Sequence, residues 1–390
     1  MTKEEKLLLL NQVFSPTTPI KQKDFFIGRL SQLTKIMDAI NEEGQHAILY
    51  GERGVGKTSL ANIMVPLYTN LFPTKITCTR DDNFKSLWLQ AFNSIQFSTT
   101  TTGIGFNPQQ KETIVSLGQH FSRIDTVAPS DIVNFIRNFN TTKFLFIFDE
   151  FDNITTKKTR ASFADLIKSL SDNSDNVTIV LVGISDNVED LIGNHQSLER
   201  CLKQVKMPRM TDEESSEIIT NGLAKLDILI SEKVKKNIIE FSSGFPHYVH
   251  LLCKYGAKEI ISNEKNEFNQ AYLQIAIKIG IENSNEQLRS SYQKAITDTN
   301  GNSKWKSVLH ACAMSVSDQF DCFSVSQVLD KYNSMTGKKV KGGNISYNLN
   351  QLCLSERGDV LKKIGKGVNT RYRFINPMMK AFVKLKINCT

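Results

Sequence analysis

The sequence has little of what marks secreted, fibrous or membrane-spanning proteins. Only 9 of its 390 residues are proline, and 40% are hydrophobic, so a collagen-like, mucin-like or wholly disordered chain is excluded. No apolar run approaches the roughly 20 residues that a membrane-spanning helix needs. The acidic start of the chain also differs from a signal peptide. We therefore expect a cytoplasmic globular protein of two or three domains that does not associate with membranes.

Cysteine pairs are also missing. Seven cysteines are scattered along the chain, and no two of them form a C-x-x-C motif. Zinc sites and disulfide frameworks require closely and regularly spaced cysteines. The scatter therefore predicts reduced, mostly buried thiols.

Positive charge is concentrated at one end of the chain. The last sixty residues, 331–390, hold 13 Lys and Arg against two acids, a net charge of +11, whereas the whole chain carries only +8. The first 330 residues are thus slightly acidic. This asymmetry indicates a C-terminal module that faces a polyanion, although a solvated basic surface is the alternative.

The clearest motif follows a short apolar run at 47–50. It has the spacing G-x-x-x-x-G-K-T, from Gly51 to Thr58, and a helix-compatible stretch comes after it. Glycines at 51, 54 and 56 let backbone N–H groups converge on phosphate oxygens, Lys57 supplies a charge for the β- and γ-phosphates, and Thr58 binds Mg²⁺. The sequence therefore predicts an ATP and Mg²⁺ site with these cofactor-binding residues: Gly51, Glu52, Arg53, Gly54, Val55, Gly56, Lys57, Thr58 and Ser59.

A second strand supplies carboxylates for this site. The unbroken apolar run 144–148 is typical of a buried parallel strand, and it ends in Asp149 and Glu150. We expect Asp149 to hold the metal with Thr58, and Glu150 to act with Lys57 in catalysis by polarising the attacking water. Asp152 is expected to orient the loop.

A third apolar strand, 177–183, ends in a polar cluster. Ser185 or Asn187 could hydrogen-bond the γ-phosphate from this position. The alternative is that Ser185 or Asp186 caps the short helix beginning near Val188.

In this order the motifs resemble the AAA+ ATPases, in the branch shared by origin-recognition initiators and STAND signalling NTPases. Phe26, Ile27, Gly28 and Arg29 resemble the box that packs on adenine before the P-loop, and an amphipathic helix through Ile40 follows. The resemblance implies an α/β fold: a parallel P-loop sheet with a helical lid. It also implies that Arg200, or as second choice Arg209, reaches the γ-phosphate of a neighbouring subunit in a homo-oligomer. A plain surface salt bridge is the alternative for Arg200.

The lid is expected over 211–290, and within it Pro246 begins a helix that faces the nucleotide in the related ATPases. That helix carries His247 and His250 where initiators usually place an arginine. Residues 97–127 form an insert that reads as a loop or hairpin. The predicted domains are 1–25, an N-terminal segment; 26–208, the ATPase domain; 209–299, lid and linker; and 300–390, a basic winged helix.

The last domain shows three helical segments followed by two short strands, which is the order of a winged helix. The turn between the strands combines glycine with lysine, and its candidate DNA-binding residues are Lys362, Lys363, Lys366 and Arg371. Tyr347, Asn348 and Asn350 are placed where a recognition helix touches bases. Winged helices also dock proteins, and Arg371 could instead pair with Glu356 or Asp359.

The favoured function is an ATP-hydrolysing switch that couples its nucleotide state to oligomerisation and to engagement of double-stranded DNA or a partner. The alternative is a STAND-like sensor of a bacterial antiviral defence system that controls a separate effector protein. A replication-initiator role is disfavoured, because the arginine expected near Pro246 is missing.

Overall fold

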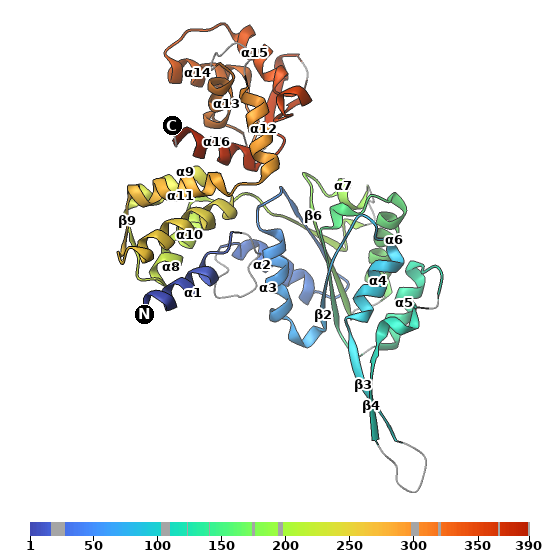
Figure 1. The fold of residues 1–390 in the computed structure, drawn as a ribbon. Coiled ribbons are helices and arrows are strands. Elements are labelled where there is room, and N and C mark those ends of the chain that lie inside the picture. The colour runs from blue at the N-terminus through green and yellow to red at the C-terminus, as the bar shows by residue number, and fades with distance from the viewer. Residues whose placement is uncertain are drawn as a thin grey trace. The chain divides into compact units, whose positions relative to one another are not determined.

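The chain divides into two compact units. We call Pro19–Pro208 the sheet unit, and Met1–Thr18 together with Arg209–Thr390 the helical unit (Figure 1). The structure is a computed structural model, and it describes residues 1–16, 28–102, 110–122, 124–139, 141–173, 176–193, 198–297, 304–318, 321–365 and 367–388. Within these ranges no helix combines the length and the apolar content needed to cross a membrane. Six cysteines lie in them, all without a disulfide and five of them buried.

The sheet unit is built on five parallel strands in the order β2-β5-β6-β1-β7. All six residues of β5 and seven of the eight of β6 are buried, as expected for parallel strands with both faces covered. This confirms the predicted parallel α/β sheet. The strands are β1 (His46–Gly51), β2 (Pro73–Thr77), β5 (Phe144–Asp149), β6 (Val177–Ile184) and β7 (Leu202–Lys206).

Helices cover both faces of this sheet. In Figure 1, α2 and α3 lie on one side of the strands and α4, α5 and α6 on the other. Under α4 and α6 lies an aromatic core in which the Trp88 ring is 5.0 Å from Phe146 and 5.4 Å from Phe148. The helices are α2 (Leu30–Asn41), α3 (Lys57–Leu67), α4 (Phe84–Asn93), α5 (Pro129–Ile136), α6 (Lys157–Asn173) and α7 (Glu189–Ile192).

The insert at 97–127 contains a hairpin. Strands β3 (Gln96–Thr102) and β4 (Gln110–Ser116) pair antiparallel, with Gln96 opposite Ser116. Figure 1 shows the hairpin projecting from the body of the sheet unit. The four consecutive threonines at 99–102 favour a strand because β-branched side chains suit the pleated backbone.

The first part of the helical unit is a bundle that also includes the N-terminal helix α1. Phe14 packs so closely on α8 that a Cβ at Gly222 would lie 2.4 Å from its ring. The predicted lid is therefore helical, and the N-terminal helix α1 belongs to the same unit as the lid. The helices are α1 (Lys3–Val13), α8 (Asp212–Ala224), α9 (Glu232–Ser242), α10 (Pro246–Ser262), α11 (Gln270–Glu282) and α12 (Glu286–Ile296). A short parallel pair, β8 (Leu229–Ile230) with β9 (Glu267–Phe268), closes the bundle.

The C-terminal part of this unit has the predicted order of three helices and an antiparallel hairpin, with one further helix. That helix, α16, starts after Asn376, whose side chain accepts a hydrogen bond from the Met378 amide at 3.0 Å. Asn-Pro before an apolar stretch is a helix-start signal that the sequence analysis did not use. The elements are α13 (Lys304–Met314), α14 (Val325–Thr336), α15 (Gly342–Gln351), β10 (Leu361–Ile364), β11 (Arg371–Phe374) and α16 (Met378–Asn388).

His250 on α10 makes the helical unit sensitive to acid. Its side chain is 4% exposed, neither ring nitrogen has a hydrogen-bond partner among the described residues, and its ring lies 5.9 Å from Phe14. Burial, with a smaller effect from His247, lowers its pKa to about 4. In the unfolded chain this group takes up its proton near pH 6.5, so the free energy of unfolding falls as the pH drops from about 6.5 to 4.

Between pH 7 and pH 4, we therefore expect the free energy of unfolding to fall by about 3 kcal/mol less in His250→Leu than in the wild type. Urea unfolding of both proteins at each pH measures this difference. The pH 7 data serve as the control, because His250 of the wild type is mostly neutral there in both the folded and the unfolded state. If the free energies of unfolding of the two proteins fall by the same amount between pH 7 and pH 4, His250 is not the source of the acid sensitivity.

Candidate functional site

The loop between β1 and α3 is shaped to surround an anion. Gly54 and Gly56 have φ of 86° and 98°, a region that favours glycine, and a Cβ at Gly51 would lie 2.4 Å from the carbonyl oxygen of Met207. Helix α3 begins at Lys57 without a side-chain cap. Its first backbone N–H groups therefore remain available to phosphate oxygens, and the helix dipole favours negative charge there.

Lys57 is folded back along this loop. Its Nζ donates to the carbonyl oxygen of Gly51 at 2.9 Å and to that of Glu52 at 2.7 Å, and the side chain is 7% exposed. Burial lowers its pKa to about 8, opposed by the charges of Asp152, Asp149 and Glu52. A buried ammonium held at the loop is the cation that a bound phosphate requires.

Asp149 and Thr58 lie side by side at the carboxyl end of β5. Asp149 is 2% exposed, and its Oδ1 lies 3.4 Å from Thr58 Oγ1 and 2.9 Å from the backbone nitrogen of Glu150. A hydroxyl beside a carboxylate is the oxygen donor set that suits Mg²⁺, which usually takes its other ligands from water and substrate phosphates. Within the described residues no cluster of three or more His, Cys, Asp or Glu offers an alternative metal site.

Glu150 follows in a constrained backbone conformation. Its φ of 55° is uncommon for a residue other than glycine, and its side chain is exposed. The Nδ2 of Asn153 donates to Glu150 Oε2 and to the carbonyl oxygen of Cys78, both at 3.1 Å. Asn153 thus ties the carboxylate to the end of β2, a role that the sequence analysis missed.

The polar cluster after β6 is engaged in local hydrogen bonds. Asp152 Oδ1 accepts from the Ile184 amide at 2.8 Å, so Asp152 links the loop after β5 to the end of β6, and its role in orienting that loop stays a prediction. Ser185 Oγ accepts from the Asn187 amide at 3.2 Å, and Asn187 Oδ1 accepts from the Asp190 amide at 3.0 Å. These hydrogen bonds hold the turn that leads into α7, whose N-cap residue is Val188 and has no side-chain cap. Contact of Ser185 or Asn187 with phosphate stays a prediction.

The box before α2 reaches the P-loop directly. Gly28 and Arg29 both have positive φ, 78° and 62°, and Arg29 is 1% exposed. Its Nη2 donates to the carbonyl oxygen of Val55 at 3.2 Å. Arg29 therefore stabilises the P-loop through this buried hydrogen bond. Phe26 and Ile27 lie outside the described residues.

Arg200 lies near the amino ends of the parallel strands, whereas the P-loop lies at their carboxyl ends. It precedes β7, whose residue Leu202 pairs with His46 at the start of β1, whereas the P-loop follows the end of β1. Five residue steps along a strand span about 16 Å. The side chain is 66% exposed and forms an ion pair with Asp172. Arg200 therefore lies at the end of the strands remote from the phosphate site of its own chain.

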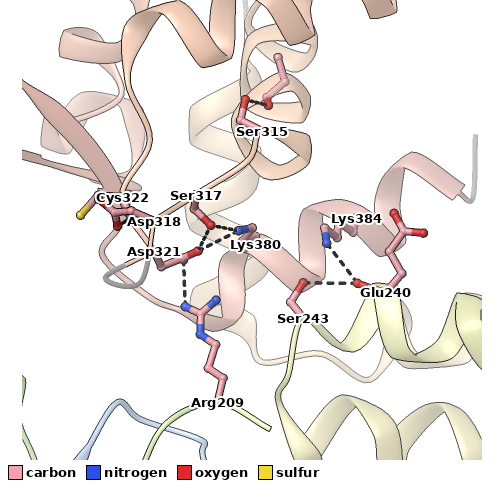
Figure 2. A network of polar contacts seen from close by, with 11 residues as sticks. Arg209, Glu240, Ser243, Ser315, Ser317, Asp318, Asp321, Cys322, Lys380 and Lys384 are labelled. Carbon is pink, nitrogen blue, oxygen red and sulfur yellow. Dashed lines mark hydrogen bonds and ion pairs between the residues drawn. The ribbon is translucent and has the colours of Figure 1, made fainter. Parts of the chain in front are cut away.

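Arg209, the second arginine candidate, is held inside the helical unit (Figure 2). Its Nη2 lies 2.9 Å from Asp321 Oδ2, and its guanidinium stacks 4.5 Å above the Phe245 ring. Lys380 of α16 pairs with the other oxygen of Asp321 at 2.7 Å and donates to Ser317. Although burial opposes it, the two cations hold the pKa of Asp321 below its usual value. This network joins the lid to the C-terminal helices.

The same network accounts for part of the basic excess at the C-terminus. Lys384 donates to the carbonyl oxygen of Glu240 at 3.1 Å (Figure 2), and burial lowers its pKa to about 8. Arg357 stacks 3.9 Å above the Trp305 ring. These cations stabilise the unit from within, so the +11 balance overstates the charge that faces solvent.

The predicted DNA-contacting residues fall into two groups. Lys362 and Lys363 are exposed on β10, and Arg371 is exposed on β11 but pairs with Asp318 at 3.1 Å, not with Glu356 or Asp359. Lys366 lies outside the described residues.

On α15, Tyr347 is 60% exposed, as a base-contacting residue would be. The expectation for Asn348 was wrong, because its side chain is 1% exposed and so is closed to a base edge. Asn350 accepts a hydrogen bond from the Tyr372 hydroxyl at 3.1 Å. Pro246 begins α10, as predicted, and its relation to a nucleotide stays a prediction.

Three solved structures are similar to this chain. The Walker-type ATPase of Pyrococcus abyssi is 15% identical with a TM-score of 0.50, and the alignment covers 94% of this chain and 99% of that one. The Aeropyrum pernix Orc1 protein in complex with DNA is 13% identical with a TM-score of 0.46, covering 97% and 96%. The Thermotoga maritima RuvB Holliday junction branch migration motor is 16% identical with a TM-score of 0.41, covering 92% and 96%.

No curated protein matches the chain in sequence. The family model of Novel STAND NTPase 1 matches residues 19–255, which is more than half of the chain and includes every P-loop and strand-end residue described above. The chain therefore belongs to the Novel STAND NTPase 1 family and is a P-loop NTPase of the STAND type.

Proposed function

We propose that this protein is an ATP-hydrolysing switch whose nucleotide state controls assembly with further copies of itself and engagement of double-stranded DNA or a partner protein. The observation that carries the proposal is the convergence of four side chains at one edge of the sheet. Lys57 and Thr58 come from the start of α3, and Asp149 and Glu150 from the end of β5. These are the groups that phosphoryl transfer to water requires.

Each of these residues has a distinct task. Lys57 and the N-terminal amides of α3 bind phosphate, and Thr58 and Asp149 hold Mg²⁺, which neutralises charge on the phosphates. Glu150, exposed and held by Asn153, accepts a proton from the attacking water. Asn153 links this carboxylate to the carbonyl oxygen of Cys78, directly after β2.

Control of assembly is assigned to Arg200. Its exposed side chain lies near the amino ends of the strands, remote from its own P-loop. A γ-phosphate that Arg200 contacts therefore belongs to a neighbouring copy. Arg209 is less suited, because it is committed to Asp321 and Phe245.

A mixing experiment tests this assignment. Arg200→Ala subunits keep an intact hydrolytic site, and Glu150→Gln subunits keep an intact Arg200, so each protein alone is expected to be nearly inactive. With ATP and duplex DNA present, their mixture should regain roughly a quarter to a half of the wild-type rate, because one subunit completes the site of the other. A mixture no faster than its components contradicts action in trans. Asp172→Ala is the matched control: it breaks the Arg200 ion pair, keeps the arginine, and should remain active.

For DNA engagement the supporting observation is the exposed basic edge of the C-terminal hairpin. Lys362 and Lys363 are exposed there, and the loop before α15 adds the exposed Lys338, Lys339 and Lys341. Three helices followed by a hairpin are the elements of a winged helix, in which such lysines meet phosphates.

Reversing Lys362, Lys363 and Lys366 to Glu is expected to lower affinity for duplex DNA at least about 100-fold at 100 mM salt and to leave ATP hydrolysis unchanged. Fluorescence anisotropy with a labelled duplex measures the change. Reversal of Lys233 and Lys236 on α9, which makes two of the same three charge reversals elsewhere on the unit, is the control for the change in net charge. If both variants bind DNA as the wild type does, the hairpin is better explained as a protein-docking surface.

A second candidate function is favoured by the family match. A STAND-like sensor, which in a bacterial antiviral system would control a separate effector protein, would remain monomeric with ATP until a trigger binds. The ion-pair network of Arg209, Asp321 and Lys380 supports this alternative, because it fixes the C-terminal helices to the lid. The solution mass with ATP distinguishes the two functions.

A further inference from the structure

A lysine that belongs to none of the sequence motifs contacts the predicted metal ligand. Lys75 lies on β2, and its Nζ is 2.9 Å from Asp149 Oδ2, with the two side chains 19% and 2% exposed. The contact is an ion pair without hydrogen-bond geometry. The same Nζ donates to Asn62 Oδ1 on α3 at 2.8 Å. Lys75 thus bridges the P-loop helix and the metal-binding strand.

Strand register explains why this lysine reaches the site. Lys75 pairs with Ile147, so Asp149 stands two residues further along the neighbouring strand, on the same face of the sheet. From there the flexible stem of Lys75 carries the ammonium to the strand end. Asn62, one turn after Thr58 on α3, accepts from it and fixes its position.

The two oxygens of Asp149 face different partners. Oδ1 lies beside Thr58 Oγ1 and accepts from the Glu150 amide, whereas Oδ2 faces the ammonium of Lys75. The ion pair therefore fixes the carboxylate so that Oδ1 stays toward Thr58. It also cancels the charge of a carboxylate that is almost wholly buried, where an unpaired charge would be costly.

We infer that Lys75 is a positioning residue that makes metal binding depend on the nucleotide. Alone, the Thr58 and Asp149 pair carries a single negative charge, and Lys75 neutralises it. A divalent cation therefore gains little by entering without phosphates. When nucleotide phosphates are present, their negative charge outweighs Lys75 and favours the metal. Premature occupation of Asp149 by a free cation is thereby suppressed.

This inference rests on the proposed nucleotide site, and the test separates the two. Mn²⁺ alone, without nucleotide, is titrated into the full-length protein, and free Mn²⁺ is followed by its electron paramagnetic resonance signal. Lys75→Gln removes the charge and keeps an amide that can still donate to Asp149 and Asn62. We expect it to bind Mn²⁺ about 10-fold more tightly than the wild type, while Lys75→Arg stays like the wild type.

Two further variants serve as controls for the Mn²⁺ titration. Lys75→Met removes charge and hydrogen bonding together, and it should also tighten Mn²⁺ binding if Lys75→Gln does not fold. Adding Asp149→Asn to Lys75→Gln should abolish the gain, since the gain is assigned to that carboxylate. Equal Mn²⁺ affinity of the wild type and a folded charge-removing variant overturns the inference and leaves Lys75 a purely structural role.

The proposed function is checked separately with a fluorescent ATP analogue. If the wild type fails to bind the analogue with Mg²⁺, the nucleotide site itself is refuted, whatever the Mn²⁺ titration gives. If the wild type binds it and the Lys75 variants bind Mn²⁺ no more tightly, only the inference about Lys75 fails.

Discussion

Replacing Glu150 with Gln is expected to reduce the rate of ATP hydrolysis by about 100- to 10,000-fold, the range that a general base contributes. ATP affinity should change by less than about 3-fold, because Lys57, Thr58 and Asp149 are untouched. Gln is nearly isosteric, and its amide oxygen can still accept the hydrogen bond from Asn153 Nδ2. Phosphate release under saturating ATP measures the rate, and a fluorescent ATP analogue measures the affinity.

The control for this prediction is Glu189→Gln, which removes an exposed carboxylate from α7 in the same unit. It should hydrolyse ATP at the wild-type rate. Equal hydrolysis by Glu150→Gln and the wild type would show that another group activates the water.

Lys57→Ala is expected to weaken ATP binding by about 30- to 4,000-fold, since removing one partner of a buried charge contact costs about 2–5 kcal/mol. Its ammonium is the buried cation at the P-loop, and two carbonyl groups, of Gly51 and Glu52, hold it in place. Thermal unfolding with and without ATP provides the readout. The wild type should be stabilised by ATP and the variant should not.

Lys158→Ala is the comparison for this second prediction, because it removes an exposed lysine from α6 of the same unit. It should keep the ATP-dependent rise in melting temperature. If Lys57→Ala keeps that rise as well, the P-loop does not bind the phosphates as described.

Local sequence patterns were sufficient to predict three of the five strands of the central sheet, β1, β5 and β6, and the polar residues that follow them, but not β2 or β7. The spacing from Gly51 to Thr58 imposes one backbone geometry, and the apolar run of β5 identifies a strand buried on both faces. Parallel strands end at a common edge, so Asp149 could be placed beside Thr58 from sequence alone. Where one motif dictates one geometry, prediction succeeded.

Contacts that depend on pairing between distant segments could not be predicted. The ion pair of Lys75 with Asp149 exists because β2 lies next to β5 in a particular register, and no local pattern encodes that register. The burial of Asn348 and the pairing of Lys380 with Asp321 likewise follow from how the C-terminal helices pack. The net charge of 331–390 describes the surface only if all its charged side chains are exposed, whereas several of them pack inside the unit.

The molar mass of the Glu150→Gln protein in solution shows whether ATP, together with duplex DNA, drives assembly. Light scattering is recorded with ATP and Mg²⁺, with and without duplex DNA, and Arg200→Ala in the Glu150→Gln background is the control. We expect a mass of several subunits with ATP and duplex DNA together, and its loss in the Arg200→Ala control. A mass of one subunit, 44.0 kDa, under every condition would contradict it and favour a sensor that awaits its trigger.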